Sequence, residues 1–182
     1  MRIAVGCDHV GVLLKEPILE ALEKDGHAVL DLGTFSTDSV DYPDFARAVS
    51  HAVRGGFVDA GLLICDSGTG ASIAANKVRG IRAAFCPDPE TARQSREEDD
   101  ANLLCLSGRS TDLHDTVEIV RLWLSSRFSG ADTHVRLLGK IARMEDHLPT
   151  TLEQVIRAAA PPRPARVELA PVAKAPESSD AG

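Results

Sequence analysis

The sequence lacks the features that mark nucleic-acid-binding, secreted and membrane proteins. Lys and Arg number 20 against 27 Asp and Glu, so the net charge is −7 and the clustered positive charge that phosphate backbones require is missing. No run approaches the ~20 apolar residues of a membrane span. The N-terminal apolar run is too short for the core of a signal peptide. These absences predict a cytoplasmic protein that binds no nucleic acid and no membrane and acts on a small molecule.

The four cysteines also lack a pattern that would pair them. None has the C-x-x-C spacing of zinc sites and redox motifs, and no internal repeat is visible. The cysteines are Cys7, Cys65, Cys86 and Cys105, and three of them sit at or near the ends of apolar runs. In a reducing compartment we therefore expect free thiols, without disulfides or zinc.

What the sequence does contain is an alternation of short apolar runs and helical stretches. With 43% hydrophobic residues, 182 residues suffice for one well-buried core. Five runs have the composition of buried parallel strands, at 2–8, 28–33, 60–65, 81–86 and 101–107. Helical spacing lies between them, at 12–26, 41–56, 70–78 and 89–100. The pattern predicts a three-layer α/β/α fold, Rossmann-like or flavodoxin-like, with a five-stranded parallel sheet and ligands at the carboxyl ends of the strands.

Two further helices and a tail are expected after the last strand. Residues 111–128 and 132–148 have helical spacing but no further strand to cover, so we expect them to pack on a partner subunit or to close a rim, and we favour a homodimer or homotetramer. The predicted domain spans 1–150. We expect 151–182 to be a disordered tail, because its composition turns to Pro and Ala from about Ala158 and offers no face to bury.

The stretch "CDSGTGAS" at 65–72 is the first candidate site. It follows the third apolar run and opens a helix, where successive backbone N–H groups can receive a phosphate or an enediolate oxygen. The alternative is a tight turn that only needs Gly68 and Gly70 for positive φ.

Other polar residues follow neighbouring apolar runs, and each has a structural alternative. Asp8 and His9 come after the first run, where Asp8 could simply cap the next helix. Tyr42 could be a half-buried aromatic, Asn102 a turn residue and Arg109 a solvated charge. Taken singly, each of these residues is more often structural than functional.

Taken together, four segments resemble one family. "GCDHVGVLLKEPI", "DLGTFSTDSVDYPDFA", "LLICDSGTGASIAANKVRGIRAA" and "DANLLCLSGR" occur here in the order and spacing of the ribose-5-phosphate isomerase B family, which includes the galactose-6-phosphate isomerase subunits. The resemblance covers roughly residues 1–147. It implies a flavodoxin-like or Rossmann-like fold in a dimer or tetramer. It also implies interconversion of aldose and ketose phosphates through a cis-enediolate, without metal or cofactor.

The resemblance also implies roles for individual residues. Cys65 would be the base, in a branch of the family that differs from the one with Glu at the position of Ala71. A helix N-terminus should favour its thiolate. Ser67 would help proton movement between oxygens. The other matching positions would bind substrate: Asp8, His9, Tyr42, Asp66, the amides of Gly68, Thr69, Gly70 and Ala71, Asn102 and Arg109.

Several positions depart from the family pattern. "REEDDAN" at 96–102 replaces "R-x-H-N-D-x-N", so Glu98 stands where the histidine that opens the furanose ring is expected. Near the C-terminus, "THVRLLG" at 133–139 keeps His134 but lacks the two phosphate-binding arginines. Arg136 lies one position away and could replace one of them only if the helix turns. Asp66, where Gly is common, adds a negative charge beside the thiol.

These departures leave alternatives to ordinary ribose 5-phosphate isomerisation. A tetrose 4-phosphate cannot close a furanose, so an isomerase acting on it needs no ring-opening histidine. A partner chain could complete the site in a hetero-oligomer. The fold could also be kept as a sugar-phosphate binding protein, although binding alone needs no base such as Cys65.

Overall fold

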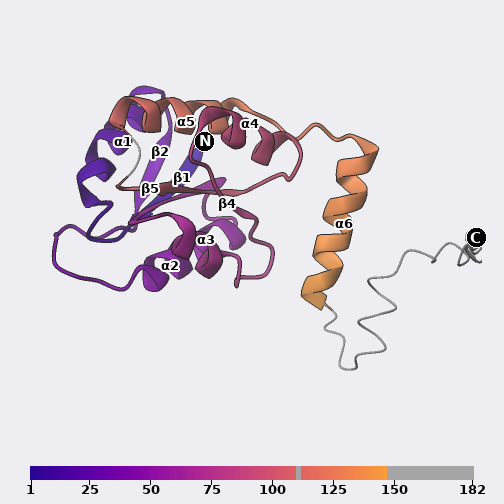
Figure 1. Cartoon of the computed structure of the whole chain (residues 1–182), viewed down its shortest axis with the longest axis horizontal. Helices are drawn as coiled ribbons and strands as arrows, with labels where there is room; N and C mark the ends of the chain where they lie inside the picture. The colour runs from indigo at the N-terminus through magenta and orange to yellow at the C-terminus, as the bar shows by residue number, and fades with distance from the viewer. Residues whose placement is uncertain (110–111, 147–182) are drawn as a thin grey trace, which may run out of the picture. The chain divides into compact units, whose positions relative to one another are not determined.

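Five parallel strands form the central sheet of the computed structural model, which describes residues 1–109 and 112–146. The strands are β1 (Arg2–Cys7), β2 (Ala28–Asp31), β3 (Ala60–Cys65), β4 (Ala83–Phe85) and β5 (Leu103–Ser107). Their order across the sheet is β2-β1-β3-β5-β4 (Figure 1). The predicted α/β fold with five parallel strands is confirmed. The predicted tail at 151–182 lies outside the described residues.

The strands are buried as their composition predicts. Every residue of β3 and β5 is buried, which is typical of parallel strands covered on both faces. Strand β4 is shorter than the predicted 81–86. The backbone N–H of Arg82 donates to the Asn102 side chain, so pairing with β5 begins only at Ala83.

Helices cover the two faces of the sheet (Figure 1). On one face lie α1 (Val12–Lys24), α4 (Pro89–Glu97) and α5 (Leu113–Ser125), and on the other lie α2 (Tyr42–Arg54) and α3 (Thr69–Ala75). The premise that the helix at 111–128 has no sheet left to cover is wrong. Helix α5 buries Ile119, Val120 and Trp123 in the core of its own chain, because it covers the sheet beside α1 and α4.

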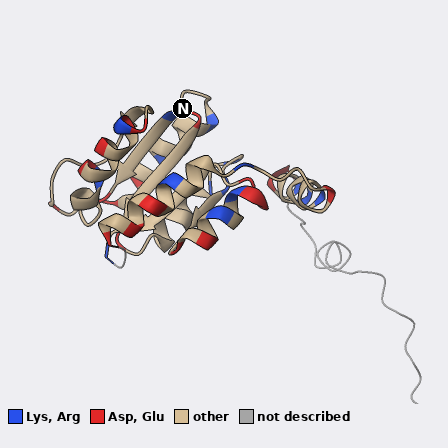
Figure 2. Ribbon diagram, turned by 90° about the horizontal axis from the view of Figure 1, so that it is seen from above, with Lys and Arg blue, Asp and Glu red and all other residues tan. Residues whose placement is uncertain are grey.

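Helix α6 (Asp132–Asp146) has no buried residue. Its last turn is tied to the chain through Arg79, which pairs with Glu145 and Asp146, and through the Gly80 amide, which donates to Glu145 Oε1 at 2.9 Å. Apolar side chains of α6 remain exposed: Val135, Leu137, Ile141 and Met144. Both signs of charge are interspersed over the helices (Figure 2). Within the described residues, none of the helices has the length and hydropathy to cross a membrane.

The strand order determines where a ligand can bind. From β1 the chain continues to β2 on one side, whereas β3 lies on the other side of β1 and the chain continues from it to β4, at the far edge of the sheet. Connections from the carboxyl ends of β1 and β3 therefore leave in opposite directions and open a crevice between them, the usual ligand position in such sheets.

Candidate active site

A cleft of about 340 Å³ opens at the carboxyl ends of the central strands. It is formed by the segments that follow β1, β3 and β5, together with the start of α2. Ten of the residues predicted from sequence line it: Asp8, His9, Tyr42, Cys65, Asp66, Ser67, Gly68, Gly70, Ala71 and Arg109. Thr69 begins α3 between two of these lining residues.

Asp8 joins the first two of these segments. Its buried carboxylate accepts the N–H groups of Val10 and Gly11 through Oδ1, each at 2.9 Å, and that of Asp66 through Oδ2 at 3.1 Å. The backbone N–H of Asp8 also donates to the carbonyl of Ile64, near the end of β3. Because three backbone amides occupy its oxygens, Asp8 holds the geometry of the cleft rather than capping α1, whose N-cap is Gly11.

Cys65 lies at the bottom of the cleft as the last residue of β3. Only 3% of the residue is exposed. Burial, followed by the negative charge of Asp8, raises the pKa of its thiol to about 12. The expectation that the helix N-terminus favours the thiolate is therefore wrong. Desolvation and a neighbouring carboxylate outweigh the short helix, so Cys65 rests as a thiol.

Glycines bring the turn after β3 close to its neighbours. Gly68 has φ of +73°, and a Cβ there would lie 2.5 Å from the Phe85 ring, so both conformation and space require glycine. Gly70 has no positive φ, contrary to the tight-turn alternative. A Cβ at Gly70 would lie 2.8 Å from the Tyr42 hydroxyl, which makes close packing the reason for this glycine. The first amides of α3, from Thr69 to Ala71, have no acceptor within the helix.

His9 is oriented by the loop that precedes α2. The backbone N–H of Val40 donates to His9 Nδ1 at 3.3 Å. In the neutral imidazole the proton then lies on Nε2, so this nitrogen is a hydrogen-bond donor. Val10 and Val40 also line the cleft, and sequence reasoning missed both. Their apolar side chains carry no chemical signal, although Val10 adjoins two predicted site residues.

Asp66 and Arg109 form an ion pair in the cleft wall. The Arg109 guanidinium contacts Asp66 Oδ1, and both side chains remain partly exposed. Ser107 links them through the backbone, since its hydroxyl donates to the Asp66 carbonyl at 2.9 Å and accepts the Arg109 N–H at 3.2 Å.

Besides Thr69, four predicted residues do not line the cleft of their own chain. Glu98 is exposed at the end of α4, the helix that leads from β4 back to the start of β5. His134 contacts Ser129 near the start of α6, and the Ser129 amide donates to the Glu97 carbonyl. Glu98 and His134 thus share a region near the end of α4. Arg136 is exposed on α6.

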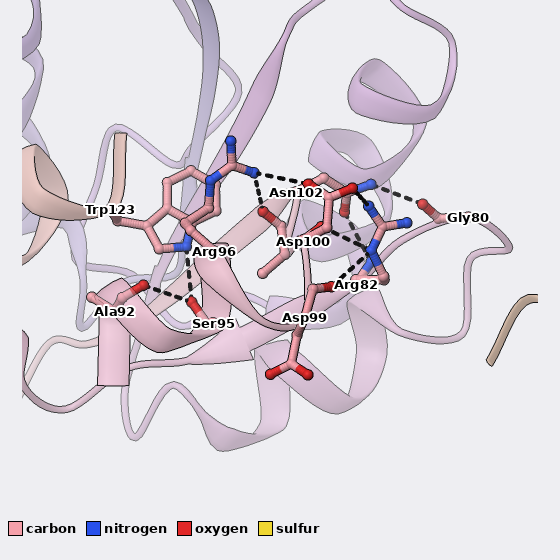
Figure 3. A network of polar contacts seen from close by, with 10 residues as sticks. Gly80, Arg82, Ala92, Ser95, Arg96, Asp99, Asp100, Asn102 and Trp123 are labelled. Carbon is pink, nitrogen blue, oxygen red and sulfur yellow. Dashed lines mark hydrogen bonds and ion pairs between the residues drawn. The ribbon is translucent and has the colours of Figure 1, made fainter. Parts of the chain in front are cut away.

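Asn102 is the fourth, and it lies at the amino end of β5 (Figure 3). Its Oδ1 accepts the Arg82 N–H at 2.9 Å and its Nδ2 donates to the Gly80 carbonyl at 2.8 Å. The side chain of Arg82 in turn binds Asp100. Among the residues that the structure describes, Asp100 is the one non-glycine residue with a positive φ. The Asn102 amide therefore supports the connection before β5, and the cleft lies at the opposite end of that strand.

The chain matches the family model described as Ribose/Galactose Isomerase over residues 3–141. It is 46% identical over 129 residues to ribose-5-phosphate isomerase B of Escherichia coli strain K12, covering 71% of this chain and 87% of that protein. It is 38% identical over 128 residues to galactose-6-phosphate isomerase subunit LacB of Clostridium acetobutylicum, covering 70% and 74% of the two chains.

Solved structures agree with this match. Ribose-5-phosphate isomerase B of Clostridium thermocellum superposes with a TM-score of 0.79 at 47% identity, covering 80% of this chain and 98% of that one. The Mycoplasma genitalium enzyme with bound ribulose-5-phosphate gives 0.77 at 39% identity, covering 81% and 97%. The chain therefore belongs to the ribose/galactose isomerase family of sugar-phosphate isomerases, enzymes that interconvert aldoses and ketoses.

Proposed function

We propose that the cleft interconverts an aldose phosphate and its ketose phosphate, of the ribose 5-phosphate/ribulose 5-phosphate type, with Cys65 as the base. The observation that carries this proposal is the position of Cys65. It is a buried thiol at the end of a central strand, directly before amides that can bind a developing oxyanion. A protein that only bound sugar phosphates would need no such group.

The chemistry moves one proton between two carbons. The Cys65 thiolate takes the proton from C2 of the aldose, and the electrons of that C–H bond form the C1–C2 double bond of a cis-enediolate. The amides from Gly68 to Ala71 stabilise the negative oxygen. The Ser67 hydroxyl helps to move a proton between the two oxygens, and the thiol returns its proton to C1. His9 and Tyr42 hold substrate hydroxyls, Arg109 binds the phosphate, and Asp8 keeps the loops in place.

The substrate preference follows from Glu98. Opening a furanose requires a group that titrates near neutral pH, which suits histidine, whereas carboxylates titrate about two units lower. We expect the purified chain to act poorly on ribose 5-phosphate and better on tetrose 4-phosphates, which stay open. Glu98→His should raise kcat/KM for ribose 5-phosphate by at least about tenfold, with no gain for erythrose 4-phosphate. Coupled assays on tetrose, pentose and hexose phosphates measure this.

The matched control is Glu118→His, which places the same side chain at an exposed position on α5 and should change neither rate. If the unmodified protein turns over ribose 5-phosphate at about 1 to 1,000 per second, another residue opens the ring and the argument from Glu98 is wrong. If the protein binds these phosphates without isomerising any of them, the alternative of a binding protein gains support.

We also propose that two copies of the chain form a homodimer through α6. Leu137, Ile141 and Met144 recur at helical spacing on α6, and all three are exposed within the described part of one chain. Glu98 and His134 lie away from their own cleft, so a second copy offers a way for them to reach a cleft. Such a dimer would complete a composite site.

Ile141→Glu should therefore convert the dimer to monomers, because a carboxylate cannot be buried in an apolar interface without a partner. Multi-angle light scattering measures the mass, and the isomerase rate should fall with it. Arg143→Glu, which lies about 100° or more around the same helix from each of the three apolar side chains, is the control and should leave the dimer intact. A monomeric but fully active protein would contradict the composite site, and activity that requires a second, different chain would favour a hetero-oligomer.

A further inference from the structure

Asp66 is held rigidly by its backbone, while its side chain is free to change partner. Its N–H donates to Asp8 Oδ2 and its carbonyl accepts the Ser107 hydroxyl, so both peptide groups are fixed by the central strands. The carboxylate projects into the cleft and is about half exposed. The backbone therefore places a negative charge in the cleft at a fixed point.

Arg109 is the counter-ion of that charge. Asp66 Oδ1, which contacts the guanidinium, is shielded from solvent and has no hydrogen bond to another of the described residues. Among the described residues that line the cleft, Arg109 carries the one guanidinium and there is no lysine. The acidic side chains among them are Asp8 and Asp66. Because Arg109 Nε is the atom that contacts Asp66, a phosphate that binds this face of the guanidinium has to displace the carboxylate of Asp66.

We propose that Asp66 determines the specificity of the cleft by competing with phosphate for Arg109. The proposal rests on the isomerase function proposed above and deepens it, because it says how the site tells a sugar phosphate from other phosphates. The exchange leaves Asp66 without its counter-ion, so a ligand is favoured when it offers the freed carboxylate a new partner.

A sugar phosphate can offer that partner and inorganic phosphate cannot. When the phosphate of the sugar binds Arg109, the hydroxyls of the chain lie beside Asp66 and can donate to it, which restores part of the lost interaction. Inorganic phosphate fills the Arg109 subsite but leaves the carboxylate unpaired and close to a second negative group. Asp66 therefore weakens binding of inorganic phosphate more than binding of substrate.

The test measures inorganic phosphate by titration calorimetry and ribulose 5-phosphate by initial rates. Ribulose 5-phosphate cannot close a furanose, since its O5 carries the phosphate, so ring opening does not enter. We expect Asp66→Asn and Asp66→Gly to lower the Kd of inorganic phosphate by about fivefold to tenfold. The KM for ribulose 5-phosphate should change by less. The Kd of inorganic phosphate divided by this KM should therefore fall in both variants.

A double-variant cycle with Arg109→Gln separates competition from a general charge effect. In the Arg109→Gln protein, Asp66→Asn should no longer change the Kd of inorganic phosphate. Asp25→Asn, which removes a partly exposed carboxylate from an ion pair with Arg121, is the matched control and should leave both constants unchanged.

Each result separates the two proposals. An unchanged Kd in both Asp66 variants, with unchanged melting temperature, overturns the competition, as does an equal decrease in the Arg109→Gln background. If none of the proteins isomerises ribulose 5-phosphate but the phosphate cycle behaves as expected, the competition between Asp66 and phosphate stands and the proposed isomerase function fails on this substrate.

Discussion

Replacement of Cys65 by alanine is expected to lower kcat by about 10²- to 10⁴-fold on the best substrate of the chain. The variant removes the group that takes the C2 proton, while the cleft keeps its amides, His9 and Arg109. The side chain lost is small, so the melting temperature should stay near that of the unmodified protein. Turnover is measured by a coupled assay, and proton transfer by exchange of the C2 hydrogen in deuterated solvent.

Cys86→Ala is the matched control, because Cys86 is also a buried thiol but lies outside the cleft, beside Ser95. It should keep full activity. Exchange of the C2 hydrogen that persists in Cys65→Ala at the rate of the unmodified protein would show that another group is the base.

The same thiol determines the pH dependence of the reaction. A pKa raised to about 12 means that the thiolate is the minor form throughout the working range, and that its population grows with pH. Since kcat/KM reports the free enzyme, we expect it to rise about tenfold per pH unit between pH 7 and 10. Conversely, a plateau reached by pH 8 would indicate a base of lower pKa and contradict this assignment of Cys65.

Replacement of Lys15 by methionine is expected to destabilise the protein by about 3 kcal/mol. The Lys15 ammonium is fully buried and donates to Asp31 Oδ2 at 2.7 Å and to the Thr34 carbonyl at 3.0 Å, with the Phe35 ring 3.9 Å away. Methionine fills a similar volume but leaves the largely buried Asp31 carboxylate without its counter-ion. Urea unfolding followed by circular dichroism measures the free energy.

Two further variants separate charge from volume. Lys24→Met removes an exposed ammonium from the same helix and should change stability by less than about 0.5 kcal/mol. Adding Asp31→Asn to Lys15→Met should recover part of the loss, because no unpaired charge is then buried. If Lys15→Met is as stable as the unmodified protein, the ion pair does not support the loop after β2.

Apolar runs in the sequence sufficed to predict the sheet, because parallel strands buried on both faces have a composition that few other elements share. The cleft was predictable for a related reason. Asp8, Cys65 and Arg109 each lie at or just after the carboxyl end of a strand, and the carboxyl ends of parallel strands meet at one edge. Val40 was not predictable, since it enters the cleft through a loop whose path depends on the buried Lys15 and on contact with His9.

Other errors arose from effects that sequence position does not show. The thiolate of Cys65 looked favourable from its neighbours in sequence. Its pKa is instead raised by burial and by the charge of Asp8, which is 57 positions away along the chain. Asn102 fits the family pattern, yet its amide is used by Gly80 and Arg82 before β5. Helix α5 was expected to be peripheral because no strand follows it in the sequence. The strand order leaves a place for it on one face of the sheet, and that order cannot be derived from the spacing of the strands.

The carboxylate of Asp8 has a consequence for how the protein acquires activity during folding. It gathers amides from two segments that are far apart in the chain, Val10 and Gly11 on one side and Asp66 on the other. Those amides meet only after β1 and β3 have paired, and closing so long a loop belongs to the slow, non-local part of folding. A partly folded chain in which β1 has paired only with β2 would hold no competent cleft. Catalytic competence therefore cannot precede the pairing of β1 with β3.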